Sequence, residues 1–455
     1  MAPSISEPRS RQTSGAANAR RQRRALRSVV VLAVLVRLAL LVGNRVAHPD
    51  LFFQDTLEIS KEISRPDLPY VNGFGFEASN IAYAWACGGQ GYASPFGGGT
   101  GPTAWIAPGV VSTYAVSFAL WGCFTPASIL FVFGIALVIS AITTVLVFQL
   151  GNRIGGEPGI GLLAALLFAV LPYEAWLFWI TGHLDFNLQV LSLAVLLLAA
   201  IRALERGSSD SGVELGTVSS LAALFNPGLL LCTAAAGLVW LRKRPVRPAS
   251  RFLLGLAVPH LLITGTYIGV QSARLGDLVP VKSNAGFELY LGNTPETGGL
   301  LTTEIFQLYH PSRNAQEFAR YQELGEAEYV RAARAKFSET IGFQEFARNS
   351  LRRALFYFLA YNPDASDSSQ AVSLLKAAMW LIPGLSLVVL VAVRRGRLAE
   401  GELVMLLFVF AYALPYMFTG VSERYRIPMA TVVAVTLAIL AYPWLKRLRS
   451  VPTAL

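Results

Sequence analysis

The sequence predicts an all-α protein that crosses a membrane many times. Of its 455 residues, 54% are apolar and only 15% are charged, whereas a soluble domain carries about 25% charged residues. Uncharged apolar runs of about 20 residues recur along the chain, which is the length that a helix needs to span a bilayer. Strands of a membrane barrel would instead alternate apolar and polar residues. The composition therefore favours a polytopic helical membrane protein.

The positive charges lie at the ends of the apolar runs. Cytoplasmic loops collect Lys and Arg, so the net charge of +10 indicates membrane topology and gives no reason to expect a nucleic-acid partner. The main clusters are the tail 1–27 and the loops 242–251 and 394–397. Placing all of them inside predicts a protein that crosses the cell membrane ten times, with both termini in the cytoplasm. The expected spans are 28–46, 126–150, 159–180, 186–200, 213–225, 228–241, 252–270, 371–393, 403–418 and 427–445.

The moderately apolar segment 110–120 decides this topology. If it crossed the membrane, the clusters 242–251 and 394–397 would fall outside, against the positive-inside rule. If it lies flat at the interface, every basic cluster falls inside. We therefore expect a flat helix. The chain then divides into a basic cytoplasmic tail (1–27), a transmembrane domain (28–445) and a short cytoplasmic tail (446–455).

Two large outer regions result, at 47–125 and 271–368. The first is rich in Gly, Pro and aromatic residues and contains a short helix predicted over 77–86. The second begins with turn-forming sequence and continues as amphipathic helices, in which Phe318 and Tyr321 begin an apolar face. Loops of this length without a function are uncommon, so both regions are candidates for a functional site.

Cysteine and histidine give no metal motif. Three cysteines and four histidines are scattered without ligand spacing. A Cys87–Cys123 disulfide on the outer side is conceivable, although spacing alone does not fix the geometry that such a bond requires. Arg37, inside the first span, must be paired or reach water.

Arg424 and Arg426 lie between two apolar runs, at a boundary that the topology places outside. Cations there are either snorkelling anchors or an anion site, because the positive-inside rule does not call for them. Guanidinium groups match phosphate oxygens. An extended backbone before Pro428 would place both arginines on one face.

Five stretches together resemble the GT-C superfamily of glycosyltransferases that use lipid-linked sugars. The branch with protein O-mannosyltransferases and the lipid A aminoarabinose transferase is the most similar, and within it the bacterial membrane glycosyltransferases. The stretches are FGFEASNIAYAWACGGQGYASPFGGGTGPTAW (74–105), WITGHLDFNL (179–188), SLAALFNPGLLL (220–231), VPVKSNAGFELYLGNTPETGG (279–299) and SERYRIP (422–428). They run in family order over nearly the whole chain after Val36.

The resemblance implies a GT-C-like bundle with an active site on the outer face, beneath the two large loops, and a polyprenyl-phosphate sugar as the donor. It also implies helices lying on the outer surface between the first two spans. Relatives often carry an acidic pair directly after the first span. Here that position is spread over Asp50, Asp55 and Glu58, and Glu77 matches the motif better, so the assignment of the base stays open.

Such a transfer needs a base for the acceptor hydroxyl and cations for the departing phosphate. The candidate bases are Glu77 and Asp185, and each could instead be an ordinary helix-terminal acid. The candidate phosphate ligands are Arg424, Arg426 and Lys282. The candidates for binding sugar or acceptor are His183, Asn226, Asn284, Glu288 and Asn293. We expect no required cofactor; if a divalent ion were used, Glu77 and Asp185 would supply hard oxygen ligands.

The sequence thus predicts a membrane glycosyltransferase of the cell envelope. It would transfer a sugar from a polyprenyl-phosphate donor to a hydroxyl of a glycolipid, glycan or protein, at the extracytoplasmic face. One alternative is an O-antigen polymerase or ligase, which would not need an acid in the first loop. The other is a transporter, which would show paired repeats and polar groups deep in its spans.

Overall fold

The computed structural model describes residues 9–47, 74–171, 182–242, 246–359 and 370–450. Regular structure in these residues is helical, apart from one isolated β-bridge between Ala93 and Pro102, so the predicted all-α class is confirmed. The helices are α1 (Arg9–Ala47), α3 (Phe76–Ala86), α4 (Pro108–Trp121), α5 (Pro126–Gly155), α6 (Pro158–Val170), α8 (Asp185–Arg206), α9 (Ser211–Ala223), α10 (Leu229–Leu241), α11 (Val246–Pro259), η1 (His260–Gly265), α12 (Thr266–Leu275), α13 (Ala285–Leu291), η2 (Pro295–Thr297), α14 (Thr303–Tyr309), α15 (Ala315–Thr340), α16 (Phe343–Leu359), α17 (Gln370–Arg394), α18 (Glu400–Phe418), η3 (Glu423–Met429) and α19 (Ala430–Ser450).

Six helices of the described chain are long and apolar enough to cross a membrane. They are Asn18–Gly43, Pro126–Gly155, Asp185–Arg206, Pro248–Leu275, Glu400–Phe418 and Arg424–Leu448, and three shorter apolar helices cover Pro158–Val170, Leu229–Leu241 and Leu381–Arg394. Part of the expected span 159–180 lies outside the described residues. The total of ten spans therefore stays a prediction.

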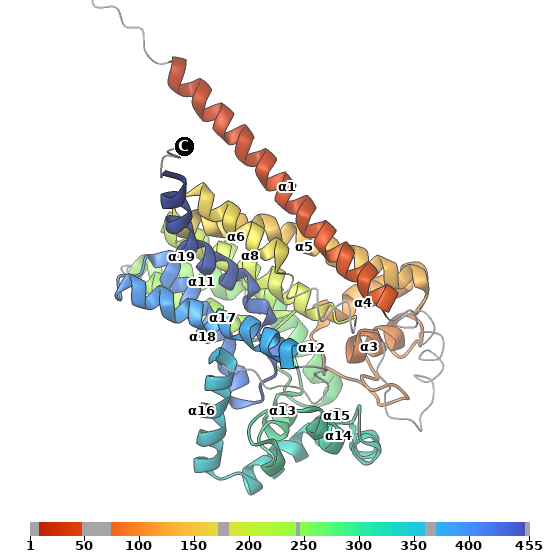
Figure 1. Ribbon diagram of the computed structural model, residues 1–455. Coiled ribbons are helices and arrows are strands. Elements are labelled where there is room, and N and C mark those ends of the chain that lie inside the picture. Colours follow the sequence, from red (N-terminus) through yellow and green to blue (C-terminus); the bar gives the residue numbers. More distant parts are fainter. Residues whose placement is uncertain (1–8, 48–73, 172–181, 243–245, 360–369, 451–455) are drawn as a thin grey trace, which may run out of the picture.

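The bundle is built around α8. In its apolar window 78% of the residues are buried, against 11% in the window of α1, which runs along one flank (Figure 1). Glycines permit the closest helix contacts, as is usual where apolar burial cannot drive helices together in lipid. A side chain at Gly161 of α6 would meet the Phe148 carbonyl of α5 at 2.5 Å, and one at Gly216 of α9 would meet the Leu256 carbonyl of α11 at 2.6 Å.

Arg37, the charge inside the first span, is fully buried against the end of α6. Its guanidinium donates hydrogen bonds to the carbonyl oxygens of Ala169 (2.8 Å) and Phe168 (3.1 Å), and it lies 5.1 Å from the Phe168 ring centre. The last carbonyls of a helix have no partner within the helix and attract cations. The required partner is thus a helix terminus.

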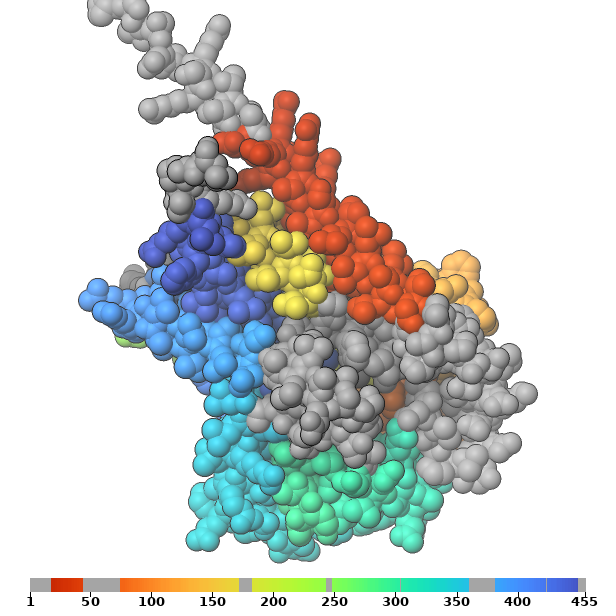
Figure 2. All heavy atoms as spheres, in the orientation of Figure 1, coloured from red at the N-terminus to blue at the C-terminus, as the bar shows by residue number. Residues whose placement is uncertain are grey.

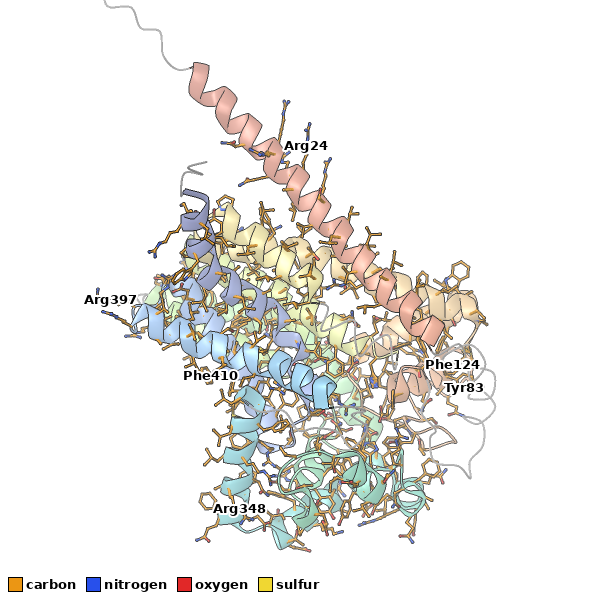
Figure 3. The ribbon with its side chains drawn as sticks, viewed as in Figure 1. Arg24, Tyr83, Phe124, Arg348, Arg397 and Phe410 are labelled. Atoms are coloured by element: carbon orange, nitrogen blue, oxygen red, sulfur yellow. A yellow bond between two sulfur atoms is a disulfide. The ribbon has the colours of Figure 1, made fainter. Side chains whose placement is uncertain are left out.

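The two ends of the bundle differ in character. At one end, which we call the basic end, Arg394 pairs with Glu402 (2.6 Å) and Lys446 pairs with Glu157 (3.1 Å). Figure 3 labels Arg24 and Arg397 towards this end, and Tyr83 and Phe124 at the opposite one. We call the opposite end, which carries α3, α4 and the region 276–359, the loop end.

Helix α4 lies across the starts and turns of other helices at the loop end. Near its beginning, the Gly109 amide donates to the Leu224 carbonyl at the α9–α10 turn. Near its end, the Ser117 hydroxyl donates to the Ser128 carbonyl in the first turn of α5 (2.7 Å). A helix with both ends at the same side of the bundle does not run parallel to the spans, which is the geometry that the flat interpretation requires. A disulfide between Cys87 and Cys123 ties the end of α3 to the turn after α4.

The second outer region packs against the first through an aromatic core. Trp105 of the first region is 2% exposed, and its ring centre lies 5.2 Å from that of Phe287 on α13 and 5.9 Å from that of Tyr321 on α15. Phe318 and Tyr321 are buried, as the periodicity predicted. Figure 2 shows this region, in green and teal, extending away from the spans.

Candidate active site

The first acidic candidate, Glu77, lies in the first turn of α3. Gly75 precedes this helix in the left-handed conformation (φ 75°), and a side chain there would meet the Tyr114 ring at 2.8 Å. The Tyr114 hydroxyl in turn donates to the Gly182 carbonyl and accepts from the Leu184 amide (2.9 Å). The start of α3 is thereby fastened to the start of α8, over 100 residues away in the sequence.

The start of α8 supplies His183 and Asp185. The His183 ring centre lies 4.1 Å from that of Phe76, the residue before Glu77. Nδ1 of His183 lies 3.6 Å from Oδ1 of Asp185, which is too long for a hydrogen bond but close enough for a charge interaction. The two candidate bases therefore come from separate segments that meet at the loop end.

Arg424, in the 3₁₀ helix η3, is the centre of the group. Its guanidinium lies 5.8 Å from the Phe306 ring centre and 5.4 Å from that of Tyr425. Charge interactions connect it to five side chains from four parts of the chain, namely Glu77, His183, Asp185, Glu288 and His310. A single cation is thus shared by three acids.

Lys282 is the second cation of the group. Its charge acts on both Glu77 and Glu288. Asn284, two residues later, donates from Nδ2 to Oε1 of Glu288 (3.1 Å). The segment 282–288 of the second outer region therefore faces the same place as α3 of the first.

Burial changes the proton affinities in this group. It raises the pKa of Glu77, an effect that the charges of Arg424 and Lys282 partly offset, and it also raises the pKa of Glu288. For His183, burial lowers the pKa, against the attraction of Asp185. Burial and then the Arg424 charge lower the pKa of His310 to about 3. Glu77 is thus a stronger base than an exposed glutamate, and the two histidines are neutral near pH 7.

Several buried polar atoms of the group have no hydrogen-bond partner among the described residues. They are Nε2 of His183, Oδ1 of Asp185 and Nε of Arg424. Leaving such atoms unpaired costs free energy, and most buried polar atoms in native proteins are satisfied. These atoms can exchange hydrogen bonds with polar groups of a ligand.

Arg426 does not share this place with Arg424. The expected extended backbone is wrong, because residues 423–429 form a 3₁₀ helix in which neighbours two apart diverge. The Arg426 guanidinium lies 5.7 Å from the Phe356 ring centre and donates to the Tyr357 carbonyl (3.4 Å), both on α16. The geometric reason for pairing the two arginines on one phosphate is therefore lost.

Asn293 and Asn226 have amides that the protein itself engages. Asn293 is fully buried; its Nδ2 donates to the Leu289 and Phe418 carbonyls, and its Oδ1 accepts from Arg353 (2.9 Å). Asn226 donates to Gln189 (3.0 Å) and to the hydroxyls of Tyr412 and Tyr416, and accepts from the Gly228 amide. Both residues hold segments together, and neither faces the charged group directly.

Three residues near the group were not anticipated from the sequence, namely His310, Tyr425 and Glu326. Tyr425 stacks on Tyr416 (4.6 Å between ring centres) and so connects η3 to the Asn226 network. Glu326 is 2% exposed on α15. An acid beside Tyr321 and Tyr329 on the apolar face of an amphipathic helix was a signal that could have found it.

The alternative first-loop acids Asp50, Asp55 and Glu58 lie outside the described residues. Among the residues that the structure does describe, no three His, Cys, Asp or Glu side chains are grouped so that they could hold a metal ion. Asp185 and Glu77 both interact with the charge of Arg424.

Comparison with known proteins places the fold. No family model and no curated protein sequence matches the chain. A solved structure that does match is the apo oligosaccharyltransferase of Archaeoglobus fulgidus, with a TM-score of 0.54 and 13% identity over 94% of this chain and 52% of that one. A second is the archaeal oligosaccharyltransferase AglB from Archaeoglobus fulgidus in complex with an inhibitory peptide and a dolichol-phosphate, with a TM-score of 0.49 and 14% identity over the same shares.

The chain thus spans about half the length of the structures that it matches. At this identity the likeness shows the fold alone, which this chain shares with the archaeal oligosaccharyltransferase.

Proposed function

We propose that this protein is an integral-membrane glycosyltransferase that moves a sugar from a polyprenyl-phosphate donor to an acceptor hydroxyl. The observation that carries the proposal is the group around Arg424. Acids, a neutral histidine and two cations from separate segments meet at the loop end of a bundle with the GT-C fold. Acid–base groups beside cations that can meet a leaving phosphate are the parts that such a transfer requires.

In the proposed step the acceptor oxygen attacks C1 of the sugar, and the bond from C1 to the phosphate oxygen breaks with inversion. Glu77 takes the acceptor proton, a role that its raised pKa favours because a stronger base removes the proton more readily. The polyprenyl phosphate leaves with the electron pair, and Arg424 and Lys282 meet its charge. Asp185 is the second candidate for the base, oriented beside His183.

The sugar would be held by polar groups of the second outer region. Asn284 and Glu288 already contact each other beside Lys282, and hydroxyl groups of a sugar can replace or extend such a hydrogen bond. We assign no required metal ion to the reaction. The acceptor class stays that predicted from the sequence, a glycolipid, glycan or protein.

The proposed orientation places the loop end outside the cytoplasm and both termini inside. The Cys87–Cys123 disulfide supports it, since disulfides persist in oxidising compartments. The ion-paired arginines and lysines of the basic end agree with the positive-inside rule. On this basis we infer a plasma-membrane protein. The five sequence stretches are the reason to assign it to the bacterial glycosyltransferases within the branch of protein O-mannosyltransferases and the lipid A aminoarabinose transferase.

The test is transfer from radiolabelled polyprenyl-phosphate sugars in membranes, with Glu77→Gln compared to wild type at matched expression. Gln keeps the shape but cannot take the proton, so we expect a loss of about 10²–10⁴-fold in kcat. The control is Glu323→Gln, an exposed acid of the second outer region, which should retain full activity.

Full activity of Glu77→Gln would move the base to Asp185. A wild type that transfers nothing from several lipid-phosphate sugars to crude acceptors would contradict the proposal and favour the polymerase or ligase alternative. Uptake of a free solute by the same membranes would favour a transporter.

A further inference from the structure

Glu326 is a buried acid that the proposed transfer step does not use. It is 2% exposed, and it follows Gly325, whose conformation (φ 71°, ψ 166°) interrupts α15. Its carboxylate accepts hydrogen bonds from the Thr103 hydroxyl, the Ala104 amide (2.6 Å) and the Tyr321 hydroxyl (2.7 Å). Two of these donors belong to the first outer region and one to the second, so the carboxylate joins the two regions.

The connection continues from Ala104 to the cation of the proposed site. The Ala104 carbonyl accepts from the amide of Ser283 (3.0 Å), the residue after Lys282. The Thr103 hydroxyl, which donates to Glu326, also accepts from the Trp105 amide (2.9 Å) and so fixes the local turn. The backbone beside Lys282 is therefore hydrogen-bonded to the segment 103–104, which Glu326 holds in place.

The backbone on the other side of Lys282 is strained. Val281 has φ 80° and is 1% exposed. A β-branched residue at positive φ is a genuine outlier, and it persists only where its surroundings impose it. Such strain is found most often at functional sites. The strained backbone at Val281 indicates that the surrounding fold fixes the position of the adjacent Lys282.

We propose that Glu326 is a positioning residue that holds Lys282 towards Arg424 and the departing phosphate, through Thr103, Ala104 and Ser283. This inference rests on the proposed function for the phosphate, but the placement of Lys282 by Glu326 is independent of it. Glu326 touches no reacting atom. It acts by fixing the distance between the cation of the second outer region and Glu77 of the first.

A double-mutant cycle tests the proposal through donor kinetics. The variants are Glu326→Gln, Lys282→Met and the pair; Gln keeps the volume of Glu326 but points an amide donor at groups that must themselves donate. We expect Glu326→Gln to raise the KM for the polyprenyl-phosphate sugar about tenfold, and to change it less than about twofold once Lys282 is Met, because coupled residues are not additive. Glu323→Gln, exposed on the same helix, should change neither value.

A second measurement does not depend on activity. Lys282 is acetylated in the purified protein with a small amine-reactive acetylating reagent. Mass spectrometry then compares the rate of acetylation at Lys282 with the rate at Lys446 of the basic end. Glu326→Gln should raise the rate at Lys282 and leave that at Lys446 unchanged. Additive kinetics together with unchanged labelling of Lys282 would overturn the proposal, as would a uniform loss of folded protein.

A wild type without transfer activity would count against the proposed function alone. The labelling result would then still decide whether Glu326 positions Lys282.

Discussion

Two arginines at the loop end, Arg353 and Arg424, are engaged in opposite ways. Arg353 on α16 is fully buried and donates to the carbonyls of Met417, Gly292 and Phe418 and to the side chain of Asn293. Arg424 lies among acids, and its Nε has no partner among the described residues. A saturated guanidinium holds structure together, whereas one with an unused donor is available for a ligand.

The same contrast holds between the bundle and the loop end. Arg37 within the bundle donates hydrogen bonds to the carbonyls at the end of α6, and these hydrogen bonds connect α1 to α6. Around Arg424, by contrast, burial raises the pKa of two acids, Glu77 and Glu288. A charged group with an unused hydrogen-bond donor, such as Arg424, is a candidate for binding a ligand, whereas Arg37 has a structural role.

The largest effect on stability should come from Arg353→Ala. The substitution removes four hydrogen bonds that a buried guanidinium donates, and a hydrogen bond to a charged group contributes about 1.5–3 kcal/mol. We expect little folded protein in detergent, measured by size-exclusion chromatography and thermal unfolding. A thermal midpoint equal to that of wild type would show that these hydrogen bonds contribute nothing and would undo the contrast with Arg424.

The largest effect on activity without a loss of folding should come from Arg424→Ala. Removing a cation that stabilises a leaving phosphate should lower kcat about 10²–10³-fold, while thermal unfolding changes little because few hydrogen bonds are lost. Arg424→Lys should recover part of the activity, since a lysine keeps the charge but not the forked geometry. If Arg424→Ala fails to fold as Arg353→Ala does, then Arg424 is structural as well.

The sequence predicted the parts of this contrast that depend on composition and motif. The apolar runs, the short helix at 77–86 and the amphipathic face that includes Phe318 are all present. Motif resemblance selected Glu77, Asp185 and Arg424, which the fold brings together. These features are encoded locally, by periodicity or by a short run of residues.

The remainder depends on partners that a sequence does not display. The partner of Arg37 is a pair of backbone carbonyls, which no residue type announces. Asn293 was expected to bind sugar, but Arg353 occupies its oxygen from 60 residues further along the chain. The divergence of Arg424 and Arg426 follows from a 3₁₀ turn, which Pro428 alone did not indicate.

A smaller and more specific effect should appear in the pH dependence. Lys282 lowers the pKa of Glu77, against the larger effect of burial, so Lys282→Met should raise that pKa further. A base must be deprotonated to act, so the acid limb of the profile of kcat/KM should move to higher pH, with the direction set by the lost positive charge. The measurement is initial rates across pH with saturating acceptor, and Lys446→Met at the basic end is the control. An acid limb that stays in place would remove Glu77 from the role of base or Lys282 from its neighbourhood.

The smallest effect on the reaction should come from Arg426, the arginine that turns away from Arg424. Its guanidinium contacts Phe356 and the Tyr357 carbonyl on α16, so Arg426→Gln should lower the thermal midpoint more than it changes the reaction. We expect the KM for the polyprenyl-phosphate donor to stay within about twofold of wild type, because a residue outside the reactive group contributes little to binding there. Arg424→Gln, assayed in parallel, should raise the same KM and lower kcat. If the two glutamine variants affect donor KM equally, then both arginines hold the phosphate, and η3 must rearrange when the donor binds.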